Sequence, residues 1–166
     1  ANPNGAPLDG NRPRETFSGY GEISDVCIKR KIRNRLQDMG EKIFVQSDDR
    51  CDDGADSLRT RADRGEALKN VTDKNVFADI ACKEWIDVRS FGQVFAFKAK
   101  KKSKDENDAV SVGVRGPVSV QTALSVSPID IESMQITKSV NGEGKGKSSD
   151  TMGMKHRVEF GLYVIK

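Results

Sequence analysis

The chain has few cysteines, and their pattern excludes two common kinds of structural support. Cys27, Cys51 and Cys82 are odd in number, widely spaced and without a CxxC pair. Such a pattern fits neither a disulfide framework nor a zinc site. We therefore expect reduced thiols and a cytoplasmic location.

Long apolar runs are also missing. No stretch approaches the ~20 apolar residues that a membrane-spanning helix needs, and residues 1–20 are rich in turn-forming residues where a secretory leader would be apolar. Charged residues make up 32% of the chain, and the mean hydropathy is -0.60. These features predict a protein with no membrane partner.

Groups that carry catalysis are scarce. His156 is the single histidine, and no carboxylate pair, Cys/His spacing or nucleophile elbow surrounds it in the sequence. The aspartates of residues 48–53 lack the regular spacing of a calcium loop. Gly146–Ser148 matches the end of a phosphate-binding GxxxxGK[ST] loop, but Asn141 stands where the first glycine belongs. We therefore predict no enzyme activity, no catalytic residue, no metal and no cofactor.

Helix signals are clearest between Ser24 and Gly40. Ser24 is a favourable N-cap and Gly40 follows the last residue with helical periodicity, so we expect a helix over residues 25–39. At about 100° per residue, its apolar side chains form one stripe with cations along both rims, which is typical of a helix packed on a sheet. The stripe consists of Ile28, Ile32, Leu36 and Met39; Lys29 and Arg33 line one rim, and Lys31 and Arg35 the other.

The remaining periodicities predict an α+β fold with a mostly antiparallel sheet. A second helix is expected over residues 72–86, with Thr72 as its cap. The length favours a single domain over residues 1–166, with inserted or flexible segments at 46–75 and 139–155. Runs of β-branched and aromatic residues predict strands over residues 42–46, 94–97, 110–114, 118–126, 131–140 and 156–165.

Positive charge is concentrated locally, although the formal net charge is only +3. Residues 29–35 carry five cations, a density suited to following a phosphate backbone, with a solvated helix face as the alternative. The run Lys98–Lys104 is interpreted as a solvated hairpin tip, with non-specific contact with nucleic acid as the alternative. Arg115 lies between glycines that let a ligand or a backbone approach closely, or that simply form a turn. Phe91 can stack on a base or fill the core.

Several of these segments together resemble the guide-RNA-binding backbone subunits of CRISPR Cascade complexes, in their subtype I-C form. The resembling segments follow the expected order along nearly the whole chain. They are Asn2–Gly5, Asn11–Arg14, Ser24–Asn34, Trp85–Phe97, Gly113–Ser119, Ser133–Ser139 and Ser149–Val158.

The resemblance implies a modified ferredoxin-like, RRM-type palm with inserted finger and thumb loops. It implies a helical filament of copies along a guide crRNA, whose bases stay available to pair with target DNA in antiviral defence. The partners would be the crRNA, target DNA through the guide, other copies and other Cascade subunits. It also implies that a first strand precedes this chain and that further sequence follows it, so for this chain alone we expect either a defect in stability or a strand donated by a neighbour. A metal-dependent RNA-cleaving CRISPR backbone subunit and a generic RNA-binding module are the alternatives.

The resemblance also assigns RNA-binding roles to side chains in three regions. Recognition of a guide of variable sequence has to use phosphates and sugars, which suits cations, hydroxyls and glycine-rich backbone. The first helix would contribute Lys29, Lys31 and Arg35; the palm would contribute Arg89, Ser90, Gln93 and Arg115; and the region that grips or kinks the strand would contribute Gln135, Thr137, Lys138, Met152, Met154 and Lys155.

Overall fold

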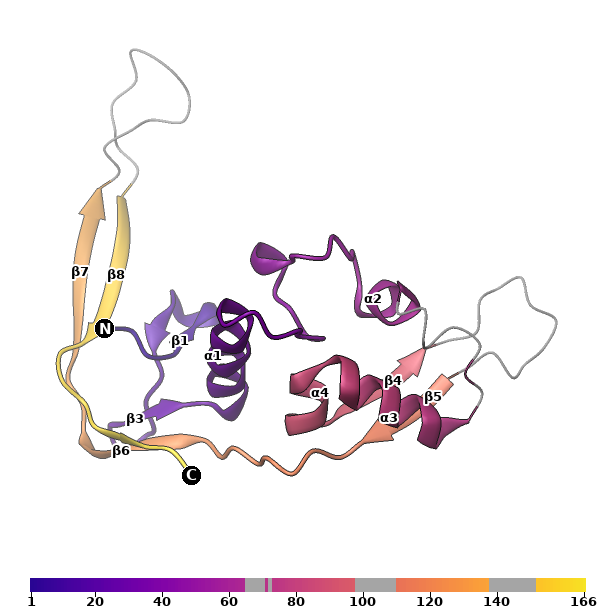
Figure 1. The fold of residues 1–166 in the computed structure, drawn as a ribbon. Coiled ribbons are helices and arrows are strands. Elements are labelled where there is room, and N and C mark those ends of the chain that lie inside the picture. The colour runs from indigo at the N-terminus through magenta and orange to yellow at the C-terminus, as the bar shows by residue number, and fades with distance from the viewer. Residues whose placement is uncertain (65–70, 72, 98–109, 138–151) are drawn as a thin grey trace, which may run out of the picture. The chain divides into compact units, whose positions relative to one another are not determined.

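The computed structural model describes residues 1–64, 71, 73–97, 110–137 and 152–166 (Figure 1). These residues form two compact units, one of Ala1–Ile28 with Val120–Lys166 and one of Lys29–Ser119. Helices accompany sheets in which all described pairings are antiparallel, so the predicted α+β class is confirmed. The single-domain assignment stays a prediction. None of the described helices is long and apolar enough to cross a membrane.

The first unit is built on a three-stranded sheet in the order β3 (Tyr20–Ile23), β6 (Ala123–Pro128) and β9 (Tyr163–Val164). The central strand β6 alternates: Ala123 and Ser125 are buried, whereas the residues that follow each of them are exposed. This is the period-2 pattern of a strand with one face packed. The buried hydroxyl of Ser125 accepts a hydrogen bond of 2.9 Å from the backbone N–H of Gly21.

The N-terminal segment of the first unit is an ordered loop. It contains β1 (Gly5–Ala6), the 3-10 turn η1 (Pro7–Asp9) and β2 (Arg12–Pro13). Gly10 (φ 56°) and Asn11 (φ 61°) are left-handed, as the reversal of the chain between the two short strands requires. At its other end, Asn4 Oδ1 accepts hydrogen bonds of 2.9 Å from both the backbone N–H and the hydroxyl of Ser24.

A two-stranded hairpin completes the first unit (Figure 1). It pairs β7 (Ile131–Thr137) with β8 (Met152–Val158) over their full lengths. Ala1 fastens the chain start to its base, because its backbone exchanges two hydrogen bonds with Val158, at 3.1 and 2.7 Å. Most side chains on both faces of the hairpin are exposed.

The second unit has an aromatic core between helices and a hairpin. Helices α3 (Lys74–Glu84) and α4 (Ile86–Phe91) precede β4 (Gln93–Phe97), which pairs with β5 (Val110–Val114). The fully buried ring of Phe95 lies 5.0 Å from that of Phe44 and 5.1 Å from that of Phe77, and the Phe44 ring lies 4.7 Å from that of Trp85. Helix α2 (Leu58–Arg64) adds Ala62 to this cluster.

The predicted helices are confirmed with adjusted bounds. Helix α1 spans Asp25–Asp38, and Gly40 beyond it has the left-handed φ of 87° expected of a terminator. The second helix is capped by Asp73 rather than by Thr72, which lies outside the described residues, and a break at Trp85 divides the predicted span into α3 and the start of α4. Helix α2 and the 3-10 turn η2 (Asp48–Arg50) were not predicted.

The predicted strand over residues 42–46 is wrong. The buried residues Ile43 and Phe44 are adjacent, so the segment does not alternate, and the N–H groups of Phe44 and Val45 donate to the side chain of Asp87 instead of to a neighbouring strand. The strand over 118–126 begins only at Ala123, and the one over 156–165 is divided between β8 and β9. Residues 138–140 of the predicted strand 131–140 lie outside the described residues, as do Lys98–Lys104 and Gly146–Ser148.

The predicted apolar stripe of α1 is only partly buried. Ile28 is 5% exposed, but Ile32 is 36% and Met39 is 65% exposed. Within the second unit, α1 instead turns Arg30, Arg33 and Gln37 toward the protein. Arg33, which the helical wheel places on a rim of the stripe, is instead turned inward by a buried carboxylate.

Candidate nucleic-acid interface

The outward face of α1 carries exposed positive charge. Lys31 and Arg35 are one helical turn apart and exposed, and Lys29 is half-buried. Within the described part of the chain, neither Lys31 nor Arg35 has a carboxylate partner. Residues four apart on a helix share a face. The structure therefore brings these two predicted phosphate contacts together on one solvent-exposed surface.

The inward face of the same helix carries cations that are already paired. Arg33 Nε donates to Asp87 Oδ2 at 3.0 Å, and the Asp87 side chain is fully buried. Arg30 Nη2 donates to the backbone oxygen of Val45 at 2.6 Å. Burial lowers the pKa of Arg30, and the neighbouring charge of Arg33 lowers it further. Two of the five clustered cations thus fasten α1, and the exposed Lys31 and Arg35 are left for an anionic partner.

The two predicted palm segments lie side by side in the second unit. A Cβ at Gly116 would stand 2.1 Å from the backbone oxygen of Ser90, a distance that no side chain tolerates. That oxygen accepts a hydrogen bond of 2.9 Å from Val118 N. The glycine therefore serves a close approach between backbones. Arg89 and Arg115 are exposed, while Ser90 and Gln93 are half-buried.

Phe91 is covered on one side by Arg33. The Cζ atom of Arg33 lies 5.1 Å from the centroid of the Phe91 ring, within the range of a cation–π contact. The ring is half-buried. This contact joins the end of α4 to α1.

The hairpin β7–β8 divides the third predicted group between two faces. Its register pairs Gln135 with Met154 and Thr137 with Met152, so these four side chains share one face. Gln135 Nε2 lies 2.8 Å from the sulfur of Met152 on that face. Lys155 is on the opposite face. Lys138 lies outside the described residues.

Each hairpin face also carries residues that sequence reasoning had not assigned. His156 Nδ1 lies 2.8 Å from the Ser133 hydroxyl on the face of Gln135. The opposite face exposes Met134 and Ile136, each at 46%, beside Lys155. One face therefore combines polar groups with two methionines, and the other combines a cation with aliphatic side chains.

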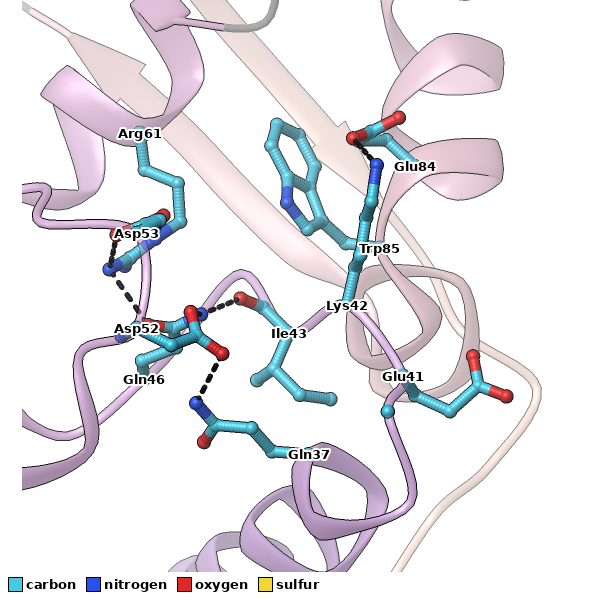
Figure 2. A pocket seen from close by; sticks show the side chains of 11 residues that line it. Gln37, Glu41, Lys42, Ile43, Gln46, Asp52, Asp53, Arg61, Glu84 and Trp85 are labelled. Atoms are coloured by element: carbon cyan, nitrogen blue, oxygen red, sulfur yellow. Dashed lines mark hydrogen bonds and ion pairs between the residues drawn. The ribbon is translucent and has the colours of Figure 1, made fainter.

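A cavity of about 390 Å³ in the second unit has a different character (Figure 2). Ile43 and Trp85 form its apolar lining, and Asp52, Asp53, Glu41 and Glu84 outnumber the cations around it. Lys42 is paired with Glu84 at 2.7 Å. An excess of carboxylates repels phosphate, so this cavity is not part of a nucleic-acid interface.

Arg61 in this cavity is fully engaged with the protein. Its guanidinium donates to both oxygens of Asp53, at 2.5 and 2.9 Å, to the backbone oxygen of Phe44 at 2.8 Å and to Gln46 Oε1 at 3.2 Å. The hydrogen bond from Arg61 holds the pKa of Asp53 well below its usual range. Among the residues that the structure describes, no group of three acidic, histidine or cysteine side chains is placed to hold a metal ion.

Sequence reasoning missed Asp87 and Arg61, each of which makes at least three side-chain hydrogen bonds in the second unit. A single aspartate in Trp85–Phe97 and one of the three arginines in the polar segment 58–64 carry no periodic signal. One sign was available: Asp87 stands between apolar residues, where a carboxylate requires partners. Contact between RNA and the assigned side chains stays a prediction.

The fold and these surfaces define an α+β protein with antiparallel sheets and outward-facing cations on its first helix. Residues 1–166 match the family model of CRISPR-associated protein Cas7. A CRISPR-associated protein Cas7 from Haloferax volcanii is 30% identical over 180 aligned residues, which cover 98% of this chain and 51% of the relative. The chain belongs to the Cas7 family of CRISPR-associated proteins, and it spans about half the length of that relative.

Proposed function

We propose that this chain is part of a non-catalytic, crRNA-binding backbone subunit of a CRISPR effector complex, working in the cytoplasm. Copies of it would coat the guide as a helical filament and present its bases to target DNA beside other Cascade subunits. Family membership supports the effector-complex role. The ordered segments Asn2–Gly5, Ser24–Asn34 and Gly113–Ser119, which resemble the subtype I-C form, support that subtype.

The observation that carries the proposal is the division of cations on α1. Arg30 and Arg33 bind acceptors inside the protein, whereas Lys31 and Arg35 point outward, without a carboxylate partner in the described part of the chain. Exposed cations without an internal partner are free to neutralise phosphates. Phosphate contacts read no sequence, as a carrier of changing guides requires.

The test is the salt dependence of RNA binding. Replacing Lys29, Lys31 and Arg35 with alanine should weaken binding about equally for several unrelated RNA sequences. Each lost contact should reduce the slope of log K against log salt by about 0.7, the value for single strands. The matched control is Lys83→Ala, which removes one exposed cation from α3 and should change little. A loss confined to some sequences would contradict a backbone role.

The non-catalytic part of the proposal has its own test. Assembled protein is incubated with end-labelled RNA and Mg²⁺, and the RNA should stay intact over hours. Cleavage that EDTA abolishes would instead support the RNA-cleaving alternative. Short RNAs of uniform length that co-purify with the protein would distinguish a guide carrier from a generic RNA-binding module.

A further inference from the structure

Helix α1 is held on the second unit by polar contacts. The buried members of the hydrophobic cluster of that unit are Phe44, Trp85 and residues of α2, α3, α4, β4 and β5, and among the described residues none comes from α1. The helix instead donates from Arg33 to Asp87, from Arg30 to the Val45 oxygen and from Gln37 Nε2 to the Arg50 oxygen at 2.8 Å. The second unit can therefore keep its core when these contacts are lost.

Arg33 has two contacts on α4, one near each end of that helix. Its Nε binds Asp87, and its guanidinium lies over the ring of Phe91. Only 12% of the Arg33 side chain is exposed, which leaves it little surface for a phosphate. Its contacts are directional, because the guanidinium plane has to satisfy a carboxylate and a ring together.

Helix α4 connects Arg33 to the second group of exposed cations. Ser90, next to Phe91, touches Gly116 and accepts a hydrogen bond from Val118, so the loop that carries Arg115 is fixed to the end of α4. A continuous set of contacts therefore runs from the α1 cations through Arg33, Phe91 and Ser90 to Arg115. Both cation groups belong to the same unit.

We propose that Arg33 is a positioning residue of the RNA-binding surface, which holds Lys31 and Arg35 of α1 at a fixed place relative to Arg115 without touching RNA. The proposal rests on the proposed function, because positioning matters only if both groups bind one strand. Two groups held in place bind a strand more tightly than two groups that have to be ordered on binding. Arg33 thus contributes to affinity by pre-organisation.

A double-mutant cycle on the full-length protein tests this role. Arg33→Met should lower RNA affinity at least tenfold, and the effect of Lys31→Ala should shrink at least threefold in the Arg33→Met background, because α1 is no longer held. Lys83→Met, the matched loss of an exposed cation, should lower affinity less than twofold and leave the effect of Lys31→Ala unchanged. Arg33→Lys, which keeps a cation opposite Asp87, should restore part of the loss. If Arg33→Met does not fold, Arg33→Lys enters the same cycle, with a smaller coupling expected.

Two results of the cycle would overturn the proposal. One is a folded Arg33→Met protein whose affinity matches that of Lys83→Met. The other is that Arg33→Met and Lys31→Ala affect RNA affinity independently, and that Arg33→Met reduces the slope of log K against log salt by about 0.7. This combination would make Arg33 a direct phosphate contact.

Hydrogen exchange without RNA separates this proposal from the proposed function. In Arg33→Met, amides of residues 29–38 should exchange at least tenfold faster, while those of α3 keep their protection. Unchanged exchange over residues 29–38 would overturn the positioning role whatever RNA does. Faster exchange in a protein whose wild type binds no RNA would overturn the proposed function and, with it, the role of Arg33 in binding.

Discussion

Replacing Asp87 should destabilise the second unit more than replacing any exposed carboxylate. The Asp87 side chain is fully buried and accepts from Arg33 Nε at 3.0 Å, Phe44 N at 2.7 Å and Val45 N at 3.1 Å. Asp87→Ala leaves a largely buried guanidinium without its counter-charge, a change that costs about 3–5 kcal/mol. It also leaves the buried N–H of Phe44 unpaired, at about 1–3 kcal/mol. Because these losses overlap, we expect the free energy of unfolding to fall by about 4 kcal/mol.

Urea denaturation followed by tryptophan fluorescence is a direct assay, because the single tryptophan, Trp85, lies in the core beside Asp87. With a slope of about 2 kcal/mol per M, the midpoint should fall by about 2 M. Asp87→Asn keeps one acceptor oxygen but points an N–H₂ group at hydrogen-bond donors. Its urea midpoint should therefore lie between those of the wild type and Asp87→Ala. The control Asp79→Ala, exposed on α3, should change stability by less than about 0.5 kcal/mol. A loss below about 1 kcal/mol for Asp87→Ala would refute this account of the buried carboxylate.

Two further predictions concern the second unit. Gly116→Ala should lower its free energy of unfolding by about 1–3 kcal/mol, because the new Cβ meets backbone that cannot move aside. Urea denaturation measures this effect, with Ser119→Ala as the control at an exposed position. Arg61→Met should reduce stability in a pH-dependent way. Arg61 depresses the pKa of Asp53 in the folded protein. The stability that this pair contributes is therefore fully present above the pKa of aspartate in the unfolded chain, near 3.9, and is lost as the pH falls through the pKa of Asp53 in the folded protein. The stability gap between wild type and Arg61→Met should therefore narrow below about pH 4, and a gap that widens there would contradict the sign.

The sequence predicted those elements whose signals are local. Ser24 and Gly40 bound α1 within a residue, because capping depends on neighbours along the chain. The strands β4, β5 and β7 were also found, since each alternates or carries β-branched residues. The fold class followed from these elements.

Two of the errors have a common physical cause, which is competition from a partner distant in sequence. Residues 42–46 have the composition of a strand, but the N–H groups of Phe44 and Val45 donate to the carboxylate of Asp87, more than forty residues away in the sequence. The helical wheel places Arg33 on the rim of the apolar stripe, but its side chain turns inward because it donates a hydrogen bond to the same carboxylate. A helical wheel treats a helix alone, so it cannot show that Arg30, Arg33 and Gln37 would pack where Ile32 and Met39 were expected.

Added salt should weaken the binding of RNA to the exposed cations of α1 but leave the buried ion pair of this helix intact. Interactions between exposed charges are screened within about 8–10 Å at physiological ionic strength, whereas those of buried pairs are screened much less. Lys31 and Arg35 are exposed, but Arg33 and Asp87 are 12% and 0% exposed. A salt concentration that releases RNA should therefore leave the amide protection of residues 29–38 close to its value in low salt. If protection of α1 and RNA affinity fell together across a salt series, the Arg33–Asp87 pair would be accessible to counter-ions, and the distinction between fastening and binding cations would fail.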